Sequence, residues 1–489
     1  MSFLDDLRSI LVSKQPYVAV ATREPERLEA LLADQARAQG RPFVRVPLTA
    51  PEPDVNQRAL HAWLDRLPQL PGGAWAWLPD ALGHLSSPGT RRRLLEAEAG
   101  LASRGVVLFL PAEFDRVPPE LAGRVATLAF PLPDLAERRT LLTAVPGPAG
   151  LPWEPSTLDG LAALLAGLTA AELTRVAARV AAADASEAPL AEARRLKADL
   201  VRRTRSLEVR YPDETLARVG GLDLLKGWLT RRKQAFRPEA RAFGLPEPRG
   251  LFLFGVQGCG KSLAAKVSSS VFDLPLLRLD FTALFGAEAA PEAGLADVLA
   301  TCDAMAPVIL WIDEIDKLFS SAGAGDTASL ARVLAGFLTW MQERRAPVFV
   351  VATANAVDRL PPELLRKGRF DDIFFLDLPG VFEREEILRI HLGLRGRDPA
   401  AYDVTALARR ATFFSGAELE QVVVGGLYRA FEAGRDLQQA DLDAEVAATV
   451  PLYATAEETV KGLREFARTR ARAATSATDV LDLFRRKGS

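Results

Sequence analysis

The sequence predicts an α/β protein in which helices cover mostly parallel sheets. Short apolar runs alternate with helical segments over the first 110 residues, from YVAVAT at 17–22 to VVLFL at 106–110. A second series contains the apolar runs at 251–254, 308–312 and 348–354. Because parallel strands need long crossover connections, this alternation is typical of a parallel sheet flanked by helices.

A glycine-rich motif follows the apolar run at 251–254. Residues 255–262 read GVQGCGKS and match the P-loop pattern G-x-x-x-x-G-K-[ST] at every fixed position; a simple glycine turn is the alternative. Glycines let backbone N–H groups surround phosphates, and the helix beginning at Lys261 points its positive end at them. Lys261 is expected to reach the β- and γ-phosphates, and Ser262 to bind Mg²⁺. The residues predicted to bind ATP in this motif are Gly255, Val256, Gln257, Gly258, Cys259, Gly260, Lys261, Ser262 and Leu263.

Two carboxylates end the apolar strand at 308–312. A carboxylate beside the phosphates can hold Mg²⁺, and a second one can polarise the attacking water. Asp313 is therefore predicted to be a metal residue and Glu314 the general base, and a solvated acidic pair is the alternative. Asn355 follows the next strand and is predicted to orient the water, although an isolated asparagine there is more often a turn former.

Two ordered matches indicate an internal duplication. The pattern D-R-[VL]-P-P-E-L begins at Asp115 and at Asp358, and Glu172 in GLTAAEL matches Glu418 in FFSGAEL at nearly the same offset. Chance similarity between two alanine- and leucine-rich segments is the alternative. The first copy lacks the P-loop glycines and lysine and has Asp80 after a proline where the second has its acidic pair. It is therefore expected not to hydrolyse nucleotide.

Composition limits the class of protein. The net charge of −2 disfavours a nucleic-acid partner, and two cysteines cannot form a disulfide framework. The three scattered histidines form no H-E-x-x-H zinc motif. The first residues, MSFLDDLRSILV, lack the basic start of a signal peptide, and no apolar run reaches the ~18 residues that span a bilayer. The expectation is a cytoplasmic protein without a membrane span.

The motifs GVQGCGKS, ILWIDEID, ATAN, LLRKGRFD and FSGAELE have the order and spacing of AAA+ ATPases, and the chain resembles that family over about residues 206–450. It most resembles the AAA ATPase encoded as a conserved reading frame in cyanobacteria and algal plastids, whose members pair a degenerate amino-terminal copy with an active one. The resemblance implies Mg²⁺-dependent ATP hydrolysis.

The resemblance also assigns roles to individual residues. It implies that Asn355 is the first sensor and that Arg366 and Arg369 are arginine fingers for the neighbouring subunit's ATP. Gly416-Ala417 resembles the second-sensor position in its form without arginine, and the turn Val219-Gly220-Gly221 resembles the adenine-contacting loop. A guanidinium at a γ-phosphate is worth ~10³ or more in rate. Fingers that act across an interface require a ring or an open helical assembly.

These features predict five segments along the chain. They are a degenerate AAA-like α/β domain at 1–133, a helical lid-like domain at 134–205, the AAA+ core at 206–380, a helical lid at 381–450 and a C-terminal helical tail at 451–489. Within this scheme, the stretch at 206–218 is expected to be a linker because Tyr211-Pro212-Asp213 interrupts the helical period.

Four features depart from the family pattern or stay open. Relatives that pull polypeptides have an aromatic followed by V-G-E, whereas Phe285 precedes the sequence GAEAAP, so translocation of a threaded substrate is doubtful. Cys259 stands where threonine is usual, either as a small side chain or as a redox-sensitive thiolate at a helix N-terminus. Arg464, Arg468 and Arg472 share a helical face that is either solvated or binds an acidic partner or nucleic acid. The segment at 479–484, DVLDLF, is either a docking peptide or a packed turn.

Three hypotheses for function follow. The first is an ATP-hydrolysing AAA+ protein that assembles into a ring, most simply a homo-hexamer, and remodels a partner protein held by the amino-terminal half or the C-terminal tail. The second is an ATP-gated assembly or binding module without mechanical translocation. The third, a nucleic-acid motor, is disfavoured by the charge balance. The substrate cannot be read from the sequence.

Overall fold

The computed structural model forms two compact units, Met1–Ala193 and Arg194–Ser489, which are described separately. The residues described are 3–13, 15–46, 53–79, 85, 87–111, 121, 123–183, 188–202, 206–211, 214–236, 238–285, 291–321, 327–344, 346–366 and 368–476. Some features named from the sequence lie outside them, namely Asp80, the start of the pattern at Asp115, most of GAEAAP after Phe285, Pro212-Asp213 and the segment at 479–484.

The first unit contains a parallel sheet whose described strands have the order β2-β3-β4-β1-β5. Its strands are β1 (Tyr17–Ala21), β2 (Phe43–Arg45), β3 (Trp75–Trp77), β4 (Val107–Pro111) and β5 (Val125–Ala129). Alternate residues of β1 enter opposite cores, because Tyr17 packs with Leu94 and Leu60 while Val18 packs with Leu28. Both faces are therefore buried, as a parallel sheet requires.

Helices cover this sheet and continue into a helical group. The helices that alternate with the strands are α1 (Phe3–Val12), α2 (Pro25–Ala38), α3 (Pro53–Leu64) and α5 (Pro88–Arg104). The helical group contains α7 (Leu135–Thr143), α8 (Pro155–Leu164) and α9 (Ala170–Ala182), and α10 (Pro189–Arg202) follows. Capping boxes start α7 and α9, in which Asp134 and Thr169 each exchange hydrogen bonds with a glutamate three residues later.

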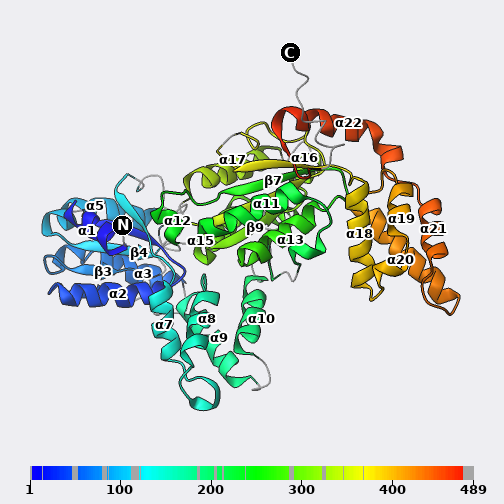
Figure 1. Cartoon of the computed structure of the whole chain (residues 1–489). Helices are drawn as coiled ribbons and strands as arrows, with labels where there is room; N and C mark the ends of the chain where they lie inside the picture. The colour runs from blue at the N-terminus through cyan, green and yellow to red at the C-terminus, as the bar shows by residue number, and fades with distance from the viewer. Residues whose placement is uncertain are drawn as a thin grey trace. The chain divides into compact units, whose positions relative to one another are not determined.

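The second unit contains a larger sheet with the order β12-β11-β7-β10-β9-β8-β6 (Figure 1). Its strands are β6 (Leu207–Arg210), β7 (Gly250–Gly255), β8 (Leu276–Leu279), β9 (Val308–Ile312), β10 (Val348–Ala354), β11 (Asp372–Leu376) and β12 (Arg472–Ala473). All pairings are parallel except that of β6 with β8. The five strands from β11 to β8 have the same chain order as the five strands of the first sheet. The expected α/β class with parallel sheets is therefore confirmed.

Two groups of helices accompany this sheet, and Figure 1 shows the second group gathered beside the core. The first comprises α11 (Asp223–Arg232), α12 (Pro238–Ala242), α13 (Lys261–Phe272), α14 (Phe281–Phe285), α15 (Pro291–Met305), α16 (Leu318–Ser321) and α17 (Thr327–Glu343). The second, the lid, comprises α18 (Val381–Leu394), α19 (Val404–Arg410), α20 (Gly416–Glu432) and α21 (Gln439–Ala448). The lid has its own buried core around Leu388, Leu407 and Val422.

A repeated arginine contact supports the inferred duplication. Arg138 donates from Nε to Ala162 O at 2.6 Å and from Nη1 to Pro133 O at 2.7 Å. In the second unit, Arg384 donates from Nε to Ala408 O and from Nη1 to Pro379 O, both at 2.8 Å. The three residues of the first contact, Arg138, Ala162 and Pro133, each precede their equivalents in the second contact by the same number of residues that separates Glu172 from Glu418. Identical contacts at one offset are not expected from similar composition alone.

Two expectations about connecting segments are corrected. The stretch expected to be a linker at 206–218 contains β6, because alternate residues Leu207 and Val209 are buried against the core. The C-terminal segment is not a tail as far as residue 476, since α22 (Tyr453–Arg470) packs on the core and β12 joins the sheet. Sequence periodicity missed β12 because a strand of two residues carries no detectable pattern.

The expectation for the three arginines is corrected at Arg464, while the exposed Arg468 and Arg472 fit the solvated alternative. Arg464 forms a bidentate ion pair with Asp377, whose side chain is 1% exposed. Arg472 pairs with Asp372 on β11, whereas Arg468 lies exposed beside Glu465. Two of the three arginines therefore hold the segment to its own core.

None of the described helices is both long and apolar enough to cross a membrane.

Candidate nucleotide site

The P-loop connects β7 to α13 and has a backbone shape that requires glycine. Gly255, Gly258 and Gly260 have φ values of +148°, +77° and +90°, which other residues rarely adopt. A Cβ on Gly255 would lie 2.0 Å from Leu376 O, and one on Gly258 would lie 2.9 Å from Ser415 Oγ. The three glycines thus keep the loop free of side chains at their positions, as close backbone approach to phosphates requires.

Lys261 begins α13 and turns its side chain back into the loop. Its Nζ donates to Gly255 O at 2.9 Å and to Val256 O at 2.8 Å. Burial lowers the pKa of Lys261 because an ammonium loses solvation inside the protein. The ammonium is therefore already positioned inside the cradle, where phosphate oxygens could replace the two carbonyl partners.

The two residues predicted to hold metal lie in direct contact. Ser262 Oγ donates to Asp313 Oδ1 at 3.1 Å, and Thr353 Oγ1 donates to the same oxygen at 2.7 Å. Mg²⁺ prefers oxygen ligands and is usually held by one or two carboxylates together with substrate phosphates. The donor set at the ends of α13, β9 and β10 fits such an ion.

Glu314 and Asn355 also meet. Asn355 Nδ2 donates to Glu314 Oε1 at 2.9 Å. Glu314 has a left-handed φ of +49°, a conformation that is unfavourable for residues other than glycine and recurs at functional sites. Its backbone N–H donates to Thr353 Oγ1 at 2.8 Å, which helps to hold this conformation. A hydrogen bond from Lys317 lowers the pKa of Glu314, so the carboxylate is ionised at neutral pH, as a general base must be.

A cavity of about 220 Å³ opens beside the P-loop within the second unit. Apolar side chains on its wall include Val219, Leu263, Ile387 and Ile390, which suit an adenine ring. Gly220 also lines it, and a Cβ there would lie 2.5 Å from Ile387 Cγ1. The adenine-contacting role expected for the turn at 219–221 is consistent with this placement.

The lid contacts both the adenine turn and the P-loop. From α18, Glu386 accepts a hydrogen bond from Gly221 N at 2.7 Å, and Glu383 accepts one from Leu222 N at 3.3 Å. At the start of α20, Ala417 N donates to Gly258 O at 3.1 Å, and Gly416 lies close enough that its Cβ would be 3.2 Å from that oxygen. The residues expected at the second-sensor position therefore adjoin the P-loop.

The two expected arginine fingers differ in accessibility. Arg366 is exposed, as a residue that reaches another subunit must be. Arg369 is only 8% exposed, and its guanidinium donates to Glu363 O in the same loop. Within this chain, Arg366 is thus the more available of the two for contact across an interface.

The redox alternative for Cys259 is not supported. Burial raises the pKa of the Cys259 thiol to about 12, because a thiolate would lose its solvation. The side chain is a protonated, 8% exposed group in the apolar cluster behind the P-loop. A small packed residue is the role that this environment favours.

Sequence reasoning missed three residues that organise the site. Thr353 joins Asp313 to the backbone of Glu314, and Asp316 accepts hydrogen bonds from Asn355 N at 3.2 Å and from Ala356 N at 3.0 Å. Both lie inside motifs already recognised, ATAN and DEID, which could have identified them. The contact of Glu383 with the adenine turn joins residues far apart in sequence and had no local signal.

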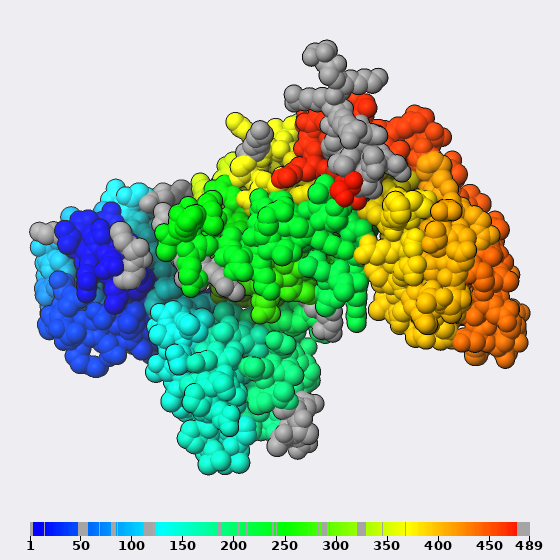
Figure 2. All heavy atoms as spheres, viewed as in Figure 1, coloured from blue at the N-terminus to red at the C-terminus, as the bar shows by residue number. Residues whose placement is uncertain are grey.

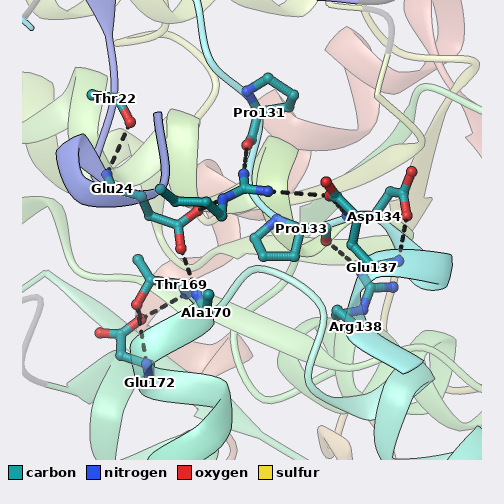
Figure 3. Close-up of polar contacts among 11 residues, drawn as sticks. Thr22, Glu24, Pro131, Pro133, Asp134, Glu137, Arg138, Thr169, Ala170 and Glu172 are labelled. Atoms are coloured by element: carbon teal, nitrogen blue, oxygen red, sulfur yellow. Dashed lines mark hydrogen bonds and ion pairs between the residues drawn. The ribbon is translucent and has the colours of Figure 1, made fainter. Parts of the chain in front are cut away.

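In the corresponding region of the first unit, side chains from several elements contact one another, as Figure 3 shows. Only residues 22–24 connect β1 to α2, whereas residues 256–260 connect β7 to α13. Glu24 occupies the N-cap position of α2, as Gly260 does in α13. Its carboxylate is buried, accepts a hydrogen bond from Ala170 N at the start of α9, and pairs with Arg27 Nε at 2.9 Å. An internal carboxylate therefore lies at the helix start where an anionic ligand would have to bind.

Arg27 extends this network to the helical group of the first unit. Its Nη1 lies 3.2 Å from Glu137 Oε2, and its Nη2 donates to Pro131 O (Figure 3). The guanidinium also lies 4.3 Å from the centre of the Phe130 ring. These contacts pair the cation with carboxylates of its own unit, and the described residues there form no cradle of the kind found in the second unit.

Comparisons with known proteins agree with this geometry. Residues 251–378 match the family described as "ATPase family associated with various cellular activities (AAA)". The chain is 34% identical over 497 residues to the AAA domain-containing protein ycf46 of Pyropia yezoensis, covering 96% of this chain and 98% of that protein. It is 33% identical over 481 residues to ycf46 of Guillardia theta, covering 96% and 95%.

A second similarity covers less than half of the chain. The chain is 37% identical over 202 residues to the ATP-dependent zinc metalloprotease FtsH of Pseudothermotoga lettingae, covering 40% of this chain and 32% of that protein. By contrast, the ycf46 proteins match along almost their whole length, through both copies of the repeat. From this coverage, together with the AAA match across the P-loop and the acidic strand, the chain belongs to the AAA ATPase family and, within it, to the AAA domain-containing proteins named ycf46.

Proposed function

We propose that this chain hydrolyses ATP with Mg²⁺, assembles into a ring that is most simply a homo-hexamer, and uses ATP turnover to remodel a partner protein. The hydrogen bond from Asn355 Nδ2 to Glu314 Oε1, next to the contact of Ser262 with Asp313, carries the proposal. It brings the proposed water-orienting group, base and metal ligands together at adjacent strand ends, which is the arrangement that in-line attack on a phosphate requires.

Each residue has a distinct part in this proposal. Ser262 and Asp313 hold Mg²⁺, which neutralises charge on the phosphates when bound. Lys261 exchanges its carbonyl partners for phosphate oxygens. Glu314 accepts a proton from the attacking water. Asn355, which is already hydrogen-bonded to Glu314, orients that water.

Assembly is proposed because the resemblance makes Arg366 and Arg369 fingers for a neighbouring subunit's ATP. Arg366 and Arg369 follow β10, and the exposed Arg366 is available to a neighbouring copy. A finger supplied in trans makes each site depend on the next subunit, and a closed ring satisfies every site. The first unit has no P-loop and has an internally paired Glu24, so we assign it to binding the partner rather than to catalysis.

The relationship to FtsH does not extend to proteolysis in this proposal. The matched segment covers only part of both proteins, and the three histidines of this chain form no H-E-x-x-H motif.

The proposed compartment is reducing, since Cys259 and Cys302 are both buried free thiols.

An ATP-gated binding module is the second candidate, and Phe285 favours it. The ring of Phe285, the residue available for gripping a threaded chain, packs against the core of the second unit. A partner could then be held and released by assembly without being pulled through the ring. Stimulation of ATP turnover by a partner supports remodelling, whereas partner binding that needs ATP but not its hydrolysis supports gating.

Two variants test the catalytic assignment. Glu314→Gln keeps the cradle and Asp313, so ATP affinity measured by calorimetry should be retained while phosphate release is abolished. Lys261→Ala removes the cation from the cradle and should weaken ATP binding itself. Phosphate release by Glu314→Gln within twofold of the parent would remove Glu314 as the base, and unchanged ATP affinity of Lys261→Ala would contradict the cradle.

A further inference from the structure

The C-terminal residues 453–476, which we call the C-terminal strap, lie along the core of the second unit. Val460, Leu463 and Ala467 of α22 are buried in its two main apolar clusters. Phe466 packs edge-on against Phe254 of β7, the strand that leads into the P-loop, with 5.5 Å between ring centres. Figure 2 shows the strap, in red, lying against the surface of the core.

After α22, the strap adds the short strand β12 to the edge of the sheet. β12 lies beside β11, which in turn pairs with the P-loop strand β7. β12 pairs in parallel with β11, and Ala474 N donates to Phe375 O at 3.1 Å. Ala474 O accepts a hydrogen bond from Leu225 N of α11, also at 3.1 Å. A single residue of the strap is therefore bonded both to the sheet and to the helix that follows the adenine turn.

The end of the strap is fixed to the start of α11. Asp223 Oδ1 accepts hydrogen bonds from Thr475 Oγ1 at 3.2 Å and from Ser476 N at 2.7 Å. These contacts with Thr475 and Ser476 lower the pKa of Asp223 although partial burial opposes them, so the ionised form binds the strap. Asp223 is two residues beyond Gly221. The strap therefore fixes the segment that directly follows the adenine turn.

Two residues connect the strap to the wall of the nucleotide cavity. Thr475, which is 5% exposed, itself lines the 220 Å³ cavity together with Val219 and Gly220. Asp377 lines the cavity as well, and Arg464 of the strap holds its carboxylate. The strap thus contributes one wall residue directly and fixes a second one.

We propose that the C-terminal strap is part of the nucleotide site, with Thr475 as a further nucleotide-contacting residue beside the adenine turn. This inference rests on the proposed function, because it takes the cavity to hold the base of ATP. It gives a role to the end of the chain that the motifs of the core do not cover: the strap adds Thr475 to the cavity wall, while Glu383 and Glu386 of α18 bind the backbone of Leu222 and Gly221.

The test is the affinity of the full chain for Mg-ADP, measured by isothermal titration calorimetry. Thr475→Trp places a large ring in the cavity and should weaken ADP binding at least tenfold. Thr469→Trp is the matched control, since Thr469 is an exposed residue of the same strap. Its ADP affinity should stay within twofold of the parent.

The possible results separate this inference from the function on which it rests. If the parent binds ADP, Lys261→Ala binds it weakly and a folded Thr475→Trp binds it like the parent, the role of the strap is refuted. If the parent shows no ADP binding, the proposed function itself fails. Should Thr475→Trp not fold, as judged by its melting curve, the smaller intrusion Thr475→Leu decides by the same criterion, with a loss of at least threefold supporting the strap and parental affinity overturning it.

Discussion

The ion pair between Arg464 and Asp377 gives a prediction whose size can be worked out from its geometry. Arg464 Nε lies 2.9 Å from Asp377 Oδ2 and its Nη2 lies 3.0 Å from Oδ1. The Asp377 side chain is 1% exposed and that of Arg464 is 26% exposed. Arg464→Ala therefore leaves a buried carboxylate without its cation, which is costly because the charge cannot be solvated in the closed state.

Removal of one partner from a buried pair typically costs about 3–5 kcal/mol. The cost for this pair should be lower, because Leu378 N still donates to Asp377 Oδ1 at 2.8 Å and Arg464 is partly solvated. We expect about 2–3 kcal/mol, the upper part of the range of about 1.5–3 kcal/mol for hydrogen bonds to charged groups. Since about 1.4 kcal/mol is a factor of ten, opening of the strap should become roughly 30- to 140-fold more favourable.

Hydrogen–deuterium exchange of the full chain measures this opening. Peptides from α22 and β12 should exchange faster in Arg464→Ala by that factor, while peptides from the first unit should be unchanged. Arg468→Ala is the matched control on the same helix, because its pair with Glu465 is exposed and such pairs contribute about 0–1 kcal/mol. Equal exchange in the two variants would refute the conclusion that Arg464 fixes the strap to the core.

Further predictions concern the nucleotide site and assembly. Asn355→Ala should slow phosphate release roughly 10²-fold with little change in ADP affinity, because it removes only the partner of Glu314; parental turnover would contradict the water-orienting role. Gly258→Val should weaken ATP binding at least tenfold in calorimetry, since its φ of +77° and its closeness to Ser415 admit no Cβ; unchanged affinity would show that the cradle is not used. Arg366→Ala should slow turnover roughly 10²-fold, and mixing it with Lys261→Ala should restore part of the activity, because one supplies intact P-loops and the other intact fingers; inactive co-assembled mixtures would count against action in trans. Calorimetry of Lys261→Ala should show no remaining ATP binding by the first unit, because Glu24 and Arg27 occupy the position equivalent to the P-loop there. Micromolar ATP binding by this variant would overturn that conclusion.

The local parts of the site could be predicted from the sequence because each depends on a few neighbouring residues. The P-loop pattern required glycines at fixed positions, and the structure gives those residues positive φ values that only glycine readily adopts. Asp313, Glu314 and Asn355 were placed at strand ends by the apolar runs before them. Carboxyl ends of parallel strands share one edge of a sheet, so their convergence also followed from the pattern.

Contacts between distant segments could not be predicted in this way. The arginine spacing on α22 indicated a solvated or partner-binding face, since nothing in the sequence places Asp377 beside Arg464. The two-residue strand β12 and the filling of the first unit's site by Glu24 and Arg27 were likewise missed. Whether a charged side chain meets solvent or an internal partner depends on the packing of the chain around it.

The sequence by itself determined the α/β class, the P-loop and the candidate catalytic side chains, because periodicity and motif spacing encode strands, turns and their ends. Only the tertiary structure decided that Thr353 links Asp313 to Glu314, that Cys259 is a protonated packed thiol, and that Thr475 lines the cavity beside the P-loop from the end of the chain. The physical reason is that burial and pairing set the charge and orientation of a side chain, and both depend on residues that are close in space but far apart along the chain.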